Sequence, residues 1–295
     1  MKPISALIRT WNSERTLERT FVSLQQQEPA IDEYIVVDSG STDGTLTIAQ
    51  QYGAKILRYP EGEAFNYSRA LNIGMAAVRN DLVLIISSHV ELLYPDVVRL
   101  MARYLEEFSA AGSYCTFTKA ERVNKEASDL ARGKLVSVIF KGNFDGHNGL
   151  WNALSLVAKS AWREHPFSED IPRAEDQEWA QWQYLHASKP TVQIRNAGAT
   201  YNNPYTNVKK DALDYAVIAH RLMPSMATWP AIFRLGLSAT WAGLRGRTDV
   251  ASRLYLCAWE TARAHFDTSH WHALGHMKSN AGGMAPTVCS RKDRA

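Results

Sequence analysis

Short apolar runs alternate with longer amphipathic segments through the first hundred residues. The runs 4–8, 34–37 and 82–86 are rich in Ile, Leu and Val, which is typical of strands buried on both faces. A capping serine and an early acid at Ser13 and Glu14 open the first helical segment. This alternation predicts an α/β fold, a mainly parallel sheet flanked by helices. The other elements expected here are a strand at 55–58 and helices at 45–52 and 68–79.

Polar clusters directly follow three of these predicted strands. Arg9–Asn12, Asp38–Asp43 and Ser87–Glu91 each begin where an apolar run ends. In open parallel sheets, ligands bind outside the carboxyl ends of the strands. The three clusters should therefore gather at one rim of the sheet, where we expect a nucleotide to bind.

The pattern loosens after residue 100 and becomes helical after Pro204. Residues 119–150 are rich in Lys, Asn and Gly, and we expect them to form a long excursion over the site. Two apolar stripes at helical spacing follow, from Phe233 to Leu244 and from Val250 to Ala262. We therefore expect a nucleotide-binding domain at 1–205 and a helical extension at 206–295.

Charge divides the chain at the same place. Residues 1–205 carry 21 Lys and Arg against 24 Asp and Glu, whereas 206–295 carry 12 against 6, which gives the net charge of +3. A basic extension on a mildly acidic body suits docking on an anionic membrane surface. A homodimer interface and a solvated cationic face are the alternatives. We expect no nucleic-acid partner.

Composition restricts the compartment more than the function. The 45% hydrophobic and 21% charged content is ordinary for a globular protein. Cys115, Cys257 and Cys289 share no metal-ligand spacing and are odd in number, which favours a reducing compartment. Neither a signal peptide nor a run of roughly 18 apolar residues is apparent. We expect a cytoplasmic protein, peripheral to the inner face of the membrane.

Several stretches of the sequence resemble one known family. Together they are similar to the inverting family 2 glycosyltransferases, which have the GT-A fold, over roughly residues 3–205. The Asn-Tyr-Ser-Arg-Ala-Leu-Asn and Glu-Asp-x-x-Trp-Ala motifs look most like rhamnosyltransferase-type members. The absence of G-x-G-x-x-G after the first strand argues against a dinucleotide-dependent oxidoreductase. The stretches that carry the resemblance are 4–12, 36–45, 66–74, 166–167 and 174–180.

The resemblance implies a nucleotide pocket on the first two polar clusters. The carboxylate of Asp38 would accept hydrogen bonds from the base or ribose, since it can read N–H and hydroxyl donors. Arg69 would lie near the diphosphate, where a charge-assisted bond is strongest. An ordinary strand-to-helix turn at 38–44 and a solvated helix arginine are the alternatives. The residues implied at the nucleotide besides Arg69 are Thr10, Asn12, Glu14, Asp38 and Ser39.

The pair Glu175–Asp176 resembles the acidic pair of the family, in which the aspartate is the general base. Such a base must lie within about 2.6–3.2 Å of the acceptor hydroxyl to remove its proton as the new bond forms. The resemblance gives Asp176 this role and Glu175 the orientation of the acceptor. An acidic first turn of a helix at 176–184 would equally suit the helix dipole.

Three further residues are candidates for contacts with the donor or acceptor sugar. Asn152 is the better match to the family's loop beneath the donor sugar, which here precedes a predicted helix at 153–164. His147 is a candidate acceptor contact. Trp179 could stack on a sugar face, although Trp179 and Trp182 also have the spacing of core residues on a helix.

The chain departs from the family where a divalent ion should bind. Ser87-Ser88-His89 follows the strand that should end in Asp-x-Asp, and 199–204 lacks the histidine that many relatives carry there. Two hydroxyls and one imidazole are poor ligands for Mg²⁺. We therefore expect no tightly bound metal. Protonated His89 would meet the diphosphate with Ser87 and Ser88, helped by Arg69 and lysines of 119–150. A weak Mn²⁺ or Mg²⁺ site that uses His89 is the alternative.

Together these features predict an inverting glycosyltransferase. It would move a sugar from a nucleotide-sugar donor onto a glycan or lipid-linked saccharide, in surface polysaccharide synthesis. The alternative is a catalytically silent scaffold of the same fold that binds a nucleotide or sugar.

Overall fold

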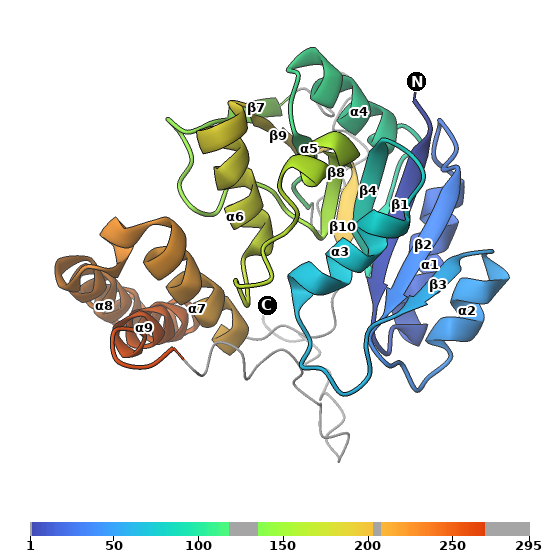
Figure 1. The fold of residues 1–295 in the computed structure, drawn as a ribbon. Coiled ribbons are helices and arrows are strands. Elements are labelled where there is room, and N and C mark those ends of the chain that lie inside the picture. The colour runs from blue at the N-terminus through green and yellow to red at the C-terminus, as the bar shows by residue number, and fades with distance from the viewer. Residues whose placement is uncertain (1, 118–134, 203–207, 269–295) are drawn as a thin grey trace, which may run out of the picture.

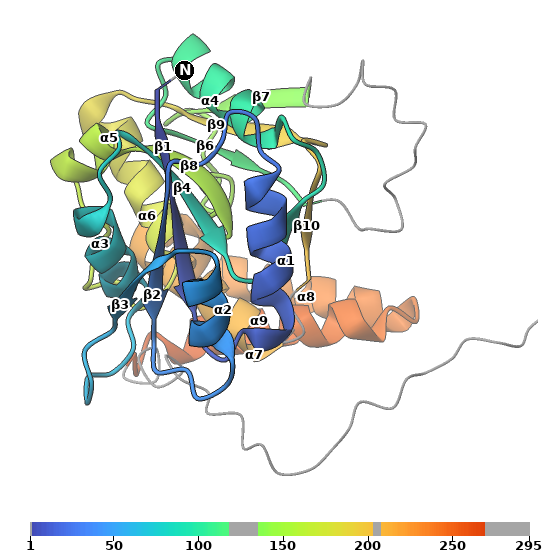
Figure 2. The ribbon, with the colours of Figure 1, turned by 90° about the vertical axis from the view of Figure 1, so that its right-hand side faces the viewer.

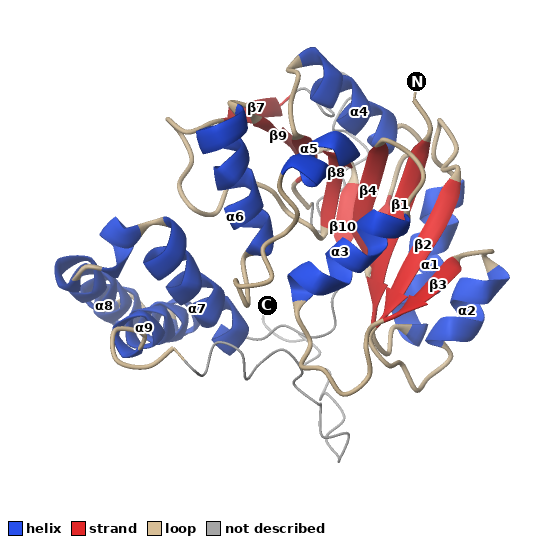
Figure 3. Cartoon of the chain, viewed as in Figure 1, coloured by secondary structure: helices blue, strands red, loops and turns tan. Residues whose placement is uncertain are grey.

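The structure is a computed structural model that describes residues 2–117, 135–202 and 208–268. At its centre lies an eight-stranded mixed sheet with the strand order β3-β2-β1-β4-β8-β6-β9-β7, and helices flank it (Figures 1 and 3). The predicted α/β fold is thus confirmed. The strands are β1 (Ile4–Thr10), β2 (Glu33–Asp38), β3 (Lys55–Arg58), β4 (Leu82–Ser87), β6 (Gly112–Cys115), β7 (Leu135–Ile139), β8 (Leu154–Ala158) and β9 (Thr191–Arg195).

The N-terminal half of the sheet is parallel. β2 and β4 pair with β1 on its two sides, and β3 extends the sheet beyond β2. Thr10 is in register with Asp38, and Arg9 with Ser87. The three polar clusters therefore lie together at one rim of the sheet, as predicted.

The pleat of β1 sorts its side chains into two core layers. Ile4, Ala6 and Ile8 pack in the layer of α1 (Glu14–Gln25), α2 (Thr45–Gln51) and α4 (Val97–Glu107). Leu7 points the other way, into the layer of α3 (Tyr67–Ala77), α5 (Lys159–Glu164) and α6 (Glu175–Trp182). Gly74 lets α3 lie close on the sheet, because a Cβ there would collide with the Leu7 side chain.

The second half of the sheet runs in mixed directions. β8 pairs antiparallel with both β4 and β6, and β7 pairs antiparallel with β9. The prediction of a helix at 153–164 is wrong, because Leu154–Ala158 form β8 and the helix α5 begins at Lys159. A short buried apolar run has no period that separates strand from helix, so pairing between β4 and β6 decides. Beside this sheet, β5 (Val90–Leu92) pairs antiparallel with β10 (Ala199–Tyr201).

The described part of the C-terminal extension, residues 208–268, is helical, as predicted. α9 (Thr248–Arg263) packs against both α7 (Val208–Val217) and α8 (Trp229–Leu244), and the three lie toward the bottom of Figures 1 and 2, with α7 nearest to α6 in Figure 1. α7 joins the main body, since Ile171 shares a core cluster with residues of α7 and Arg173 Nη1 lies 3.0 Å from Asp214 Oδ1. Within the described ranges, no helix is both long and apolar enough to cross a bilayer.

Candidate active site

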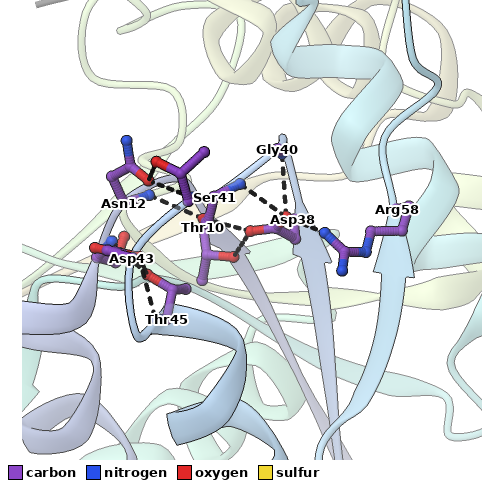
Figure 4. Close-up of polar contacts among 10 residues, drawn as sticks. Thr10, Asn12, Asp38, Gly40, Ser41, Asp43, Thr45 and Arg58 are labelled. Carbon is purple, nitrogen blue, oxygen red and sulfur yellow. Dashed lines mark hydrogen bonds and ion pairs between the residues drawn. The ribbon is translucent and has the colours of Figure 1, made fainter.

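Asp38 organises the turn after β2, which Figure 4 shows in detail. Its Oδ2 accepts hydrogen bonds from the backbone N–H groups of Gly40 and Ser41 at 3.1 and 3.0 Å. Its Oδ1 accepts from Thr10 Oγ1 at 3.2 Å and from the Ser41 hydroxyl, and Arg58 Nη1 lies 3.2 Å from Oδ2. Asp38 has no exposed surface and Thr10 almost none. A nucleotide that reads this carboxylate must therefore displace one of these donors.

Hydrogen bonds join the segment after β1 to the segment after β2. Asn12 has a φ of +45° and its Oδ1 accepts from Thr42 N at 2.8 Å, while Glu14 Oε2 accepts from Gly44 N at 3.2 Å. Ser39 N donates to Thr10 O at 3.0 Å. The structure thus brings together the predicted nucleotide residues of the first two clusters, and it gives Asn12 and Glu14 loop-bracing bonds.

Arg69 lies in the first turn of α3. Its guanidinium forms a close ion pair with Glu63 and donates from Nη2 to Glu63 Oε1 at 3.0 Å. Its backbone N–H is capped by Asn66 Oδ1 at 3.0 Å. Arg69 therefore has an acidic partner that a phosphate would have to replace.

The stretch after β4 holds three side chains of different accessibility. Ser88 is buried and its Oγ lies 2.8 Å from Ser13 Oγ, so this hydroxyl faces the core of the loop. Ser87 is half-buried and its backbone N–H donates to Ala153 O at 2.9 Å. The His89 ring packs edge-on to Tyr201 at 4.6 Å between centroids, and its Nε2 is buried without a hydrogen-bond partner in the described structure.

Burial disfavours the protonated His89 that the sequence analysis expects at the diphosphate, and this contact stays a prediction. Desolvation by burial, followed by the nearby charges of Lys210 and Arg9, lowers the pKa of His89 to about 4. The imidazole is therefore neutral. Lys210 and Arg9, which the sequence analysis did not name as nucleotide-binding residues, produce part of this shift.

The residues at this rim do not fit a divalent ion. The described ranges contain no group of three His, Cys, Asp or Glu side chains placed to hold a metal. Asn202, in the stretch where the family resemblance implies a histidine, donates from its backbone N–H to His89 O at 2.8 Å. Lys210 and Arg9 also place positive charge near His89, and this charge opposes the binding of a divalent cation. Residues 118–134, 203–207 and 269–295, with the lysines and the cysteine that they hold, lie outside the described residues.

The acidic pair opens α6 at the centre of the site. Asp176 Oδ2 accepts from Asn152 N at 3.2 Å and Oδ1 from Gln177 N at 2.9 Å. Desolvation by burial, and then the neighbouring charge of Glu175, raise the pKa of Asp176 to about 7. Glu175 Oε1 lies 3.6 Å from Arg9 Nη1 and 3.5 Å from Asn152 Nδ2. A carboxylate with a pKa near 7 can take up and release a proton at neutral pH.

The three predicted sugar contacts have different positions. Trp179 is fully buried against Phe167, and its Nε1 donates to His165 O at 2.8 Å. Sugar stacking by Trp179 is therefore wrong, because neither face of the ring is accessible. Asn152 is 2% exposed and donates hydrogen bonds to both carboxyl groups of the acidic pair. His147 is exposed and lies 5.7 Å from Tyr215 between ring centroids, so its acceptor contact stays a prediction.

Arg9, Tyr67 and Lys210 form a group that the sequence reading did not single out. The Arg9 guanidinium carbon lies 5.1 Å and Lys210 Nζ 5.3 Å from the centroid of the Tyr67 ring. Arg9 belongs to the first predicted rim cluster, so the sequence already indicated its position at the rim. The sequence did not indicate the position of Lys210, because only folding brings α7 to the rim.

The fold and the rim together define a GT-A type α/β protein with an acidic pair at the carboxyl ends of its parallel strands. The profile of the family described as glycosyl transferase family 2 matches residues 5–157, just over half of the chain. The chain belongs to this family. The match covers the strands β1 to β4 and the rim clusters that follow them.

Individual relatives agree in fold. The chain is 28% identical over 144 residues to glucosyl-3-phosphoglycerate synthase of Petrotoga mobilis, 45% of this chain and 44% of the relative. It superposes on mannosyltransferase PcManGT from Pyrobaculum calidifontis, solved with GDP-Man and Mn²⁺, with a TM-score of 0.60 and 16% identity. That match covers 88% of this chain and 87% of the other. It also superposes on S. aureus TarS 1–349 with a TM-score of 0.53 and 18% identity, and that match covers 74% of this chain and 64% of TarS 1–349.

These matches are partial in coverage or low in identity. The chain spans less than half the length of the curated relatives that it matches. Identities of 16–18% to the solved structures show the fold alone.

Proposed function

We propose that this chain is an inverting glycosyltransferase that uses a nucleoside diphosphate sugar, with Asp176 as its general base. The acceptor hydroxyl loses its proton to Asp176 as its oxygen bonds to the anomeric carbon. The bond from that carbon to the diphosphate oxygen breaks, and the nucleoside diphosphate leaves with the electron pair. Glu175, beside the base and next to Arg9, orients the acceptor.

The raised pKa of Asp176 is the observation that carries this proposal. A surface aspartate is fully ionised at neutral pH and is a weak base, whereas a pKa of about 7 matches the base to its working pH. Burying two adjacent carboxyl groups costs stability, which a domain that only binds would have no need to retain. This favours an enzyme over a silent scaffold of the same fold.

Exchange of Asp176 for Asn, assayed with UDP-, dTDP-, GDP- and CMP-sugars, tests the proposal. Turnover should fall by about 10²–10⁴-fold, the usual contribution of a general base, while affinity for the nucleoside diphosphate changes less than twofold. Asp170→Asn removes an exposed acid from the loop before α6 and is the matched control. Wild-type protein that binds a nucleotide sugar and never transfers it would establish the scaffold instead.

The acceptor side of the proposal draws on the surface of α8 and α9. We define the aromatic face as the eight large apolar side chains that are exposed there, between 49% and 82% by relative accessible surface. Trp229 meets Phe266 at 6.3 Å between centroids, and Tyr255 Oη lies 2.7 Å from Thr240 Oγ1, so the two helices share one surface. The members are Trp229, Phe233, Leu237, Trp241, Leu244, Tyr255, Trp259 and Phe266.

The charges around the aromatic face favour an anionic membrane over a second copy. Ile232, Ala239 and Ala242 bury the other side of α8, so the face is extra apolar surface rather than core. Arg245 lies over Trp241 at 4.5 Å, and α8 contains no acidic residue. A two-fold copy on α8 would set arginines against arginines, whereas Trp, Tyr and Arg suit the interface of an anionic bilayer. We infer that the chain docks there to reach a lipid-linked saccharide.

Co-sedimentation with vesicles tests the docking. Wild-type protein should bind phosphatidylglycerol vesicles, bind phosphatidylcholine vesicles weakly, and release as salt rises. Trp241→Glu should abolish binding, and Leu185→Glu, which places the same charge on an exposed apolar site of the main body, should not. A concentration-dependent dimer that Trp241→Glu dissociates would overturn the membrane assignment.

A further inference from the structure

Two cations from opposite ends of the chain meet at the rim. Arg9 is the penultimate residue of β1 and Lys210 lies in the first turn of α7, and the charged ends of both side chains lie within 5.3 Å of the centre of the Tyr67 ring. Tyr67 is the first residue of α3, whose N-terminus adds the positive end of a helix dipole. Positive charge is thus concentrated near His89, where the family resemblance implies an Asp-x-Asp motif.

Arg9 is held in place but keeps donor capacity. Its side chain is 17% exposed, and Nη1 is buried without a hydrogen-bond partner in the described structure. The 3.6 Å to Glu175 Oε1 is an ion-pair distance, longer than a hydrogen bond. A phosphate oxygen at this nitrogen would receive the bond that the structure leaves unmade.

Lys210 stays charged although it is largely enclosed. Burial acts to lower its pKa, but Tyr67 and Asp214 outweigh this effect, so the pKa is raised above its usual value. Both Lys210 and Arg9 influence His89, the residue that stands in place of the metal-binding motif. Their fields therefore overlap at that position.

We propose that Arg9 and Lys210 bind the donor diphosphate and stabilise the charge on the departing nucleoside diphosphate, in place of a divalent ion. This rests on the proposed function. As the bond between the anomeric carbon and the diphosphate oxygen breaks, the new negative charge forms next to fixed N–H donors. Such donors stabilise it more strongly at a water-poor site than in solvent. Arg9 also contacts Glu175, so it links the diphosphate to the acidic pair.

Calorimetric titration with inorganic pyrophosphate in EDTA tests this without naming the nucleobase or the sugar. Wild-type protein should bind pyrophosphate, and Arg9→Gln and Lys210→Met should each weaken binding at least tenfold. Arg9→Lys and Lys210→Arg should recover part of the loss, which separates charge from folding. Arg15→Gln, an exposed arginine of α1, and Lys209→Met, the neighbour of Lys210, are matched controls and should change affinity less than twofold.

The outcomes separate this inference from the proposed function. Asp176→Asn should bind pyrophosphate as wild type does and fail to turn over. Binding that appears only when Mn²⁺ is added, or that both charge-removing variants retain, overturns the inference. A protein that transfers no sugar but loses pyrophosphate binding in Arg9→Gln and Lys210→Met refutes the proposed function and leaves the anion site standing.

Discussion

Asp176→Asn is expected to have two opposite effects: loss of turnover and a gain of stability at neutral and alkaline pH. The ionised carboxylate of Asp176 is unfavourable in the folded protein, because burial and Glu175 raise its pKa from 3.8 to about 7. An asparagine has no charge to bury. The substitution therefore removes a destabilising group together with the proposed base.

The size of the stability effect follows from the pKa difference. Each pKa unit corresponds to about 1.4 kcal/mol, so the ionised group costs the fold up to about 4 kcal/mol above pH 7. The folded protein keeps a proton between about pH 4 and pH 7 that the unfolded chain has lost. Stability from this group is therefore complete below pH 4 and is lost as the pH rises through about 7. Between pH 5 and pH 8 the ionisation of Asp176 should lower the free energy of unfolding of the wild type by about 3 kcal/mol.

The amide introduces one cost of its own. Asn152 N and Gln177 N donate to different oxygens of Asp176, and an asparagine offers only one oxygen. One of the two N–H groups loses its acceptor, which costs about 1–3 kcal/mol. The variant should thus exceed the wild type by about 1–3 kcal/mol at pH 8, and it should be the less stable of the two at pH 4.

Urea denaturation at pH 4, 5, 6.5 and 8 measures this, with Asp170→Asn as control. The free energy of unfolding of the variant minus that of the wild type should grow by about 3 kcal/mol between pH 5 and pH 8, and the corresponding difference for the control should stay flat. Wild-type turnover should rise over the same range with a midpoint near pH 7, as Asp176 ionises. Equal pH slopes for wild type and variant would refute the reasoning.

Three further predictions test the rim, the fold and the attachment of α7. Asp38→Ala should weaken nucleotide binding and destabilise the protein by about 1–3 kcal/mol per stranded donor, which calorimetry and denaturation measure separately. Gly198→Ala, at a φ of +92° and with Tyr94 in the way, should cost several kcal/mol, whereas Gly236→Ala in the open on α8 should stabilise by about 1 kcal/mol. Asp214→Asn removes the ion pair between Arg173 and a partly exposed carboxylate and should lower the free energy of unfolding by about 1 kcal/mol, and a melting temperature equal to wild type would contradict it.

Much of the fold could be predicted because its signals are local. The strands β1, β2 and β4 follow continuous apolar runs, and parallel pairing leaves no choice but to bring their polar ends to one rim. The pair Glu175–Asp176 was recognised through the resemblance of residues 174–180 to a family motif, which is also a local signal. The error at 154–158 has the opposite cause, since that run becomes a strand only because β4 and β6 lie on either side.

The chemical state of the site depended on contacts far apart in the chain. Sequence by itself determined the class of fold and the rim, because these need only periodicity and the order of neighbouring elements, and the family resemblance indicated the acidic pair. Tertiary structure decided that Trp179 is core, that His89 is neutral and that Lys210 reaches Tyr67. Exposure and pKa depend on which groups lie within a few ångströms, and residues 9, 67, 89 and 210 become neighbours only when the sheet, α3 and α7 pack together.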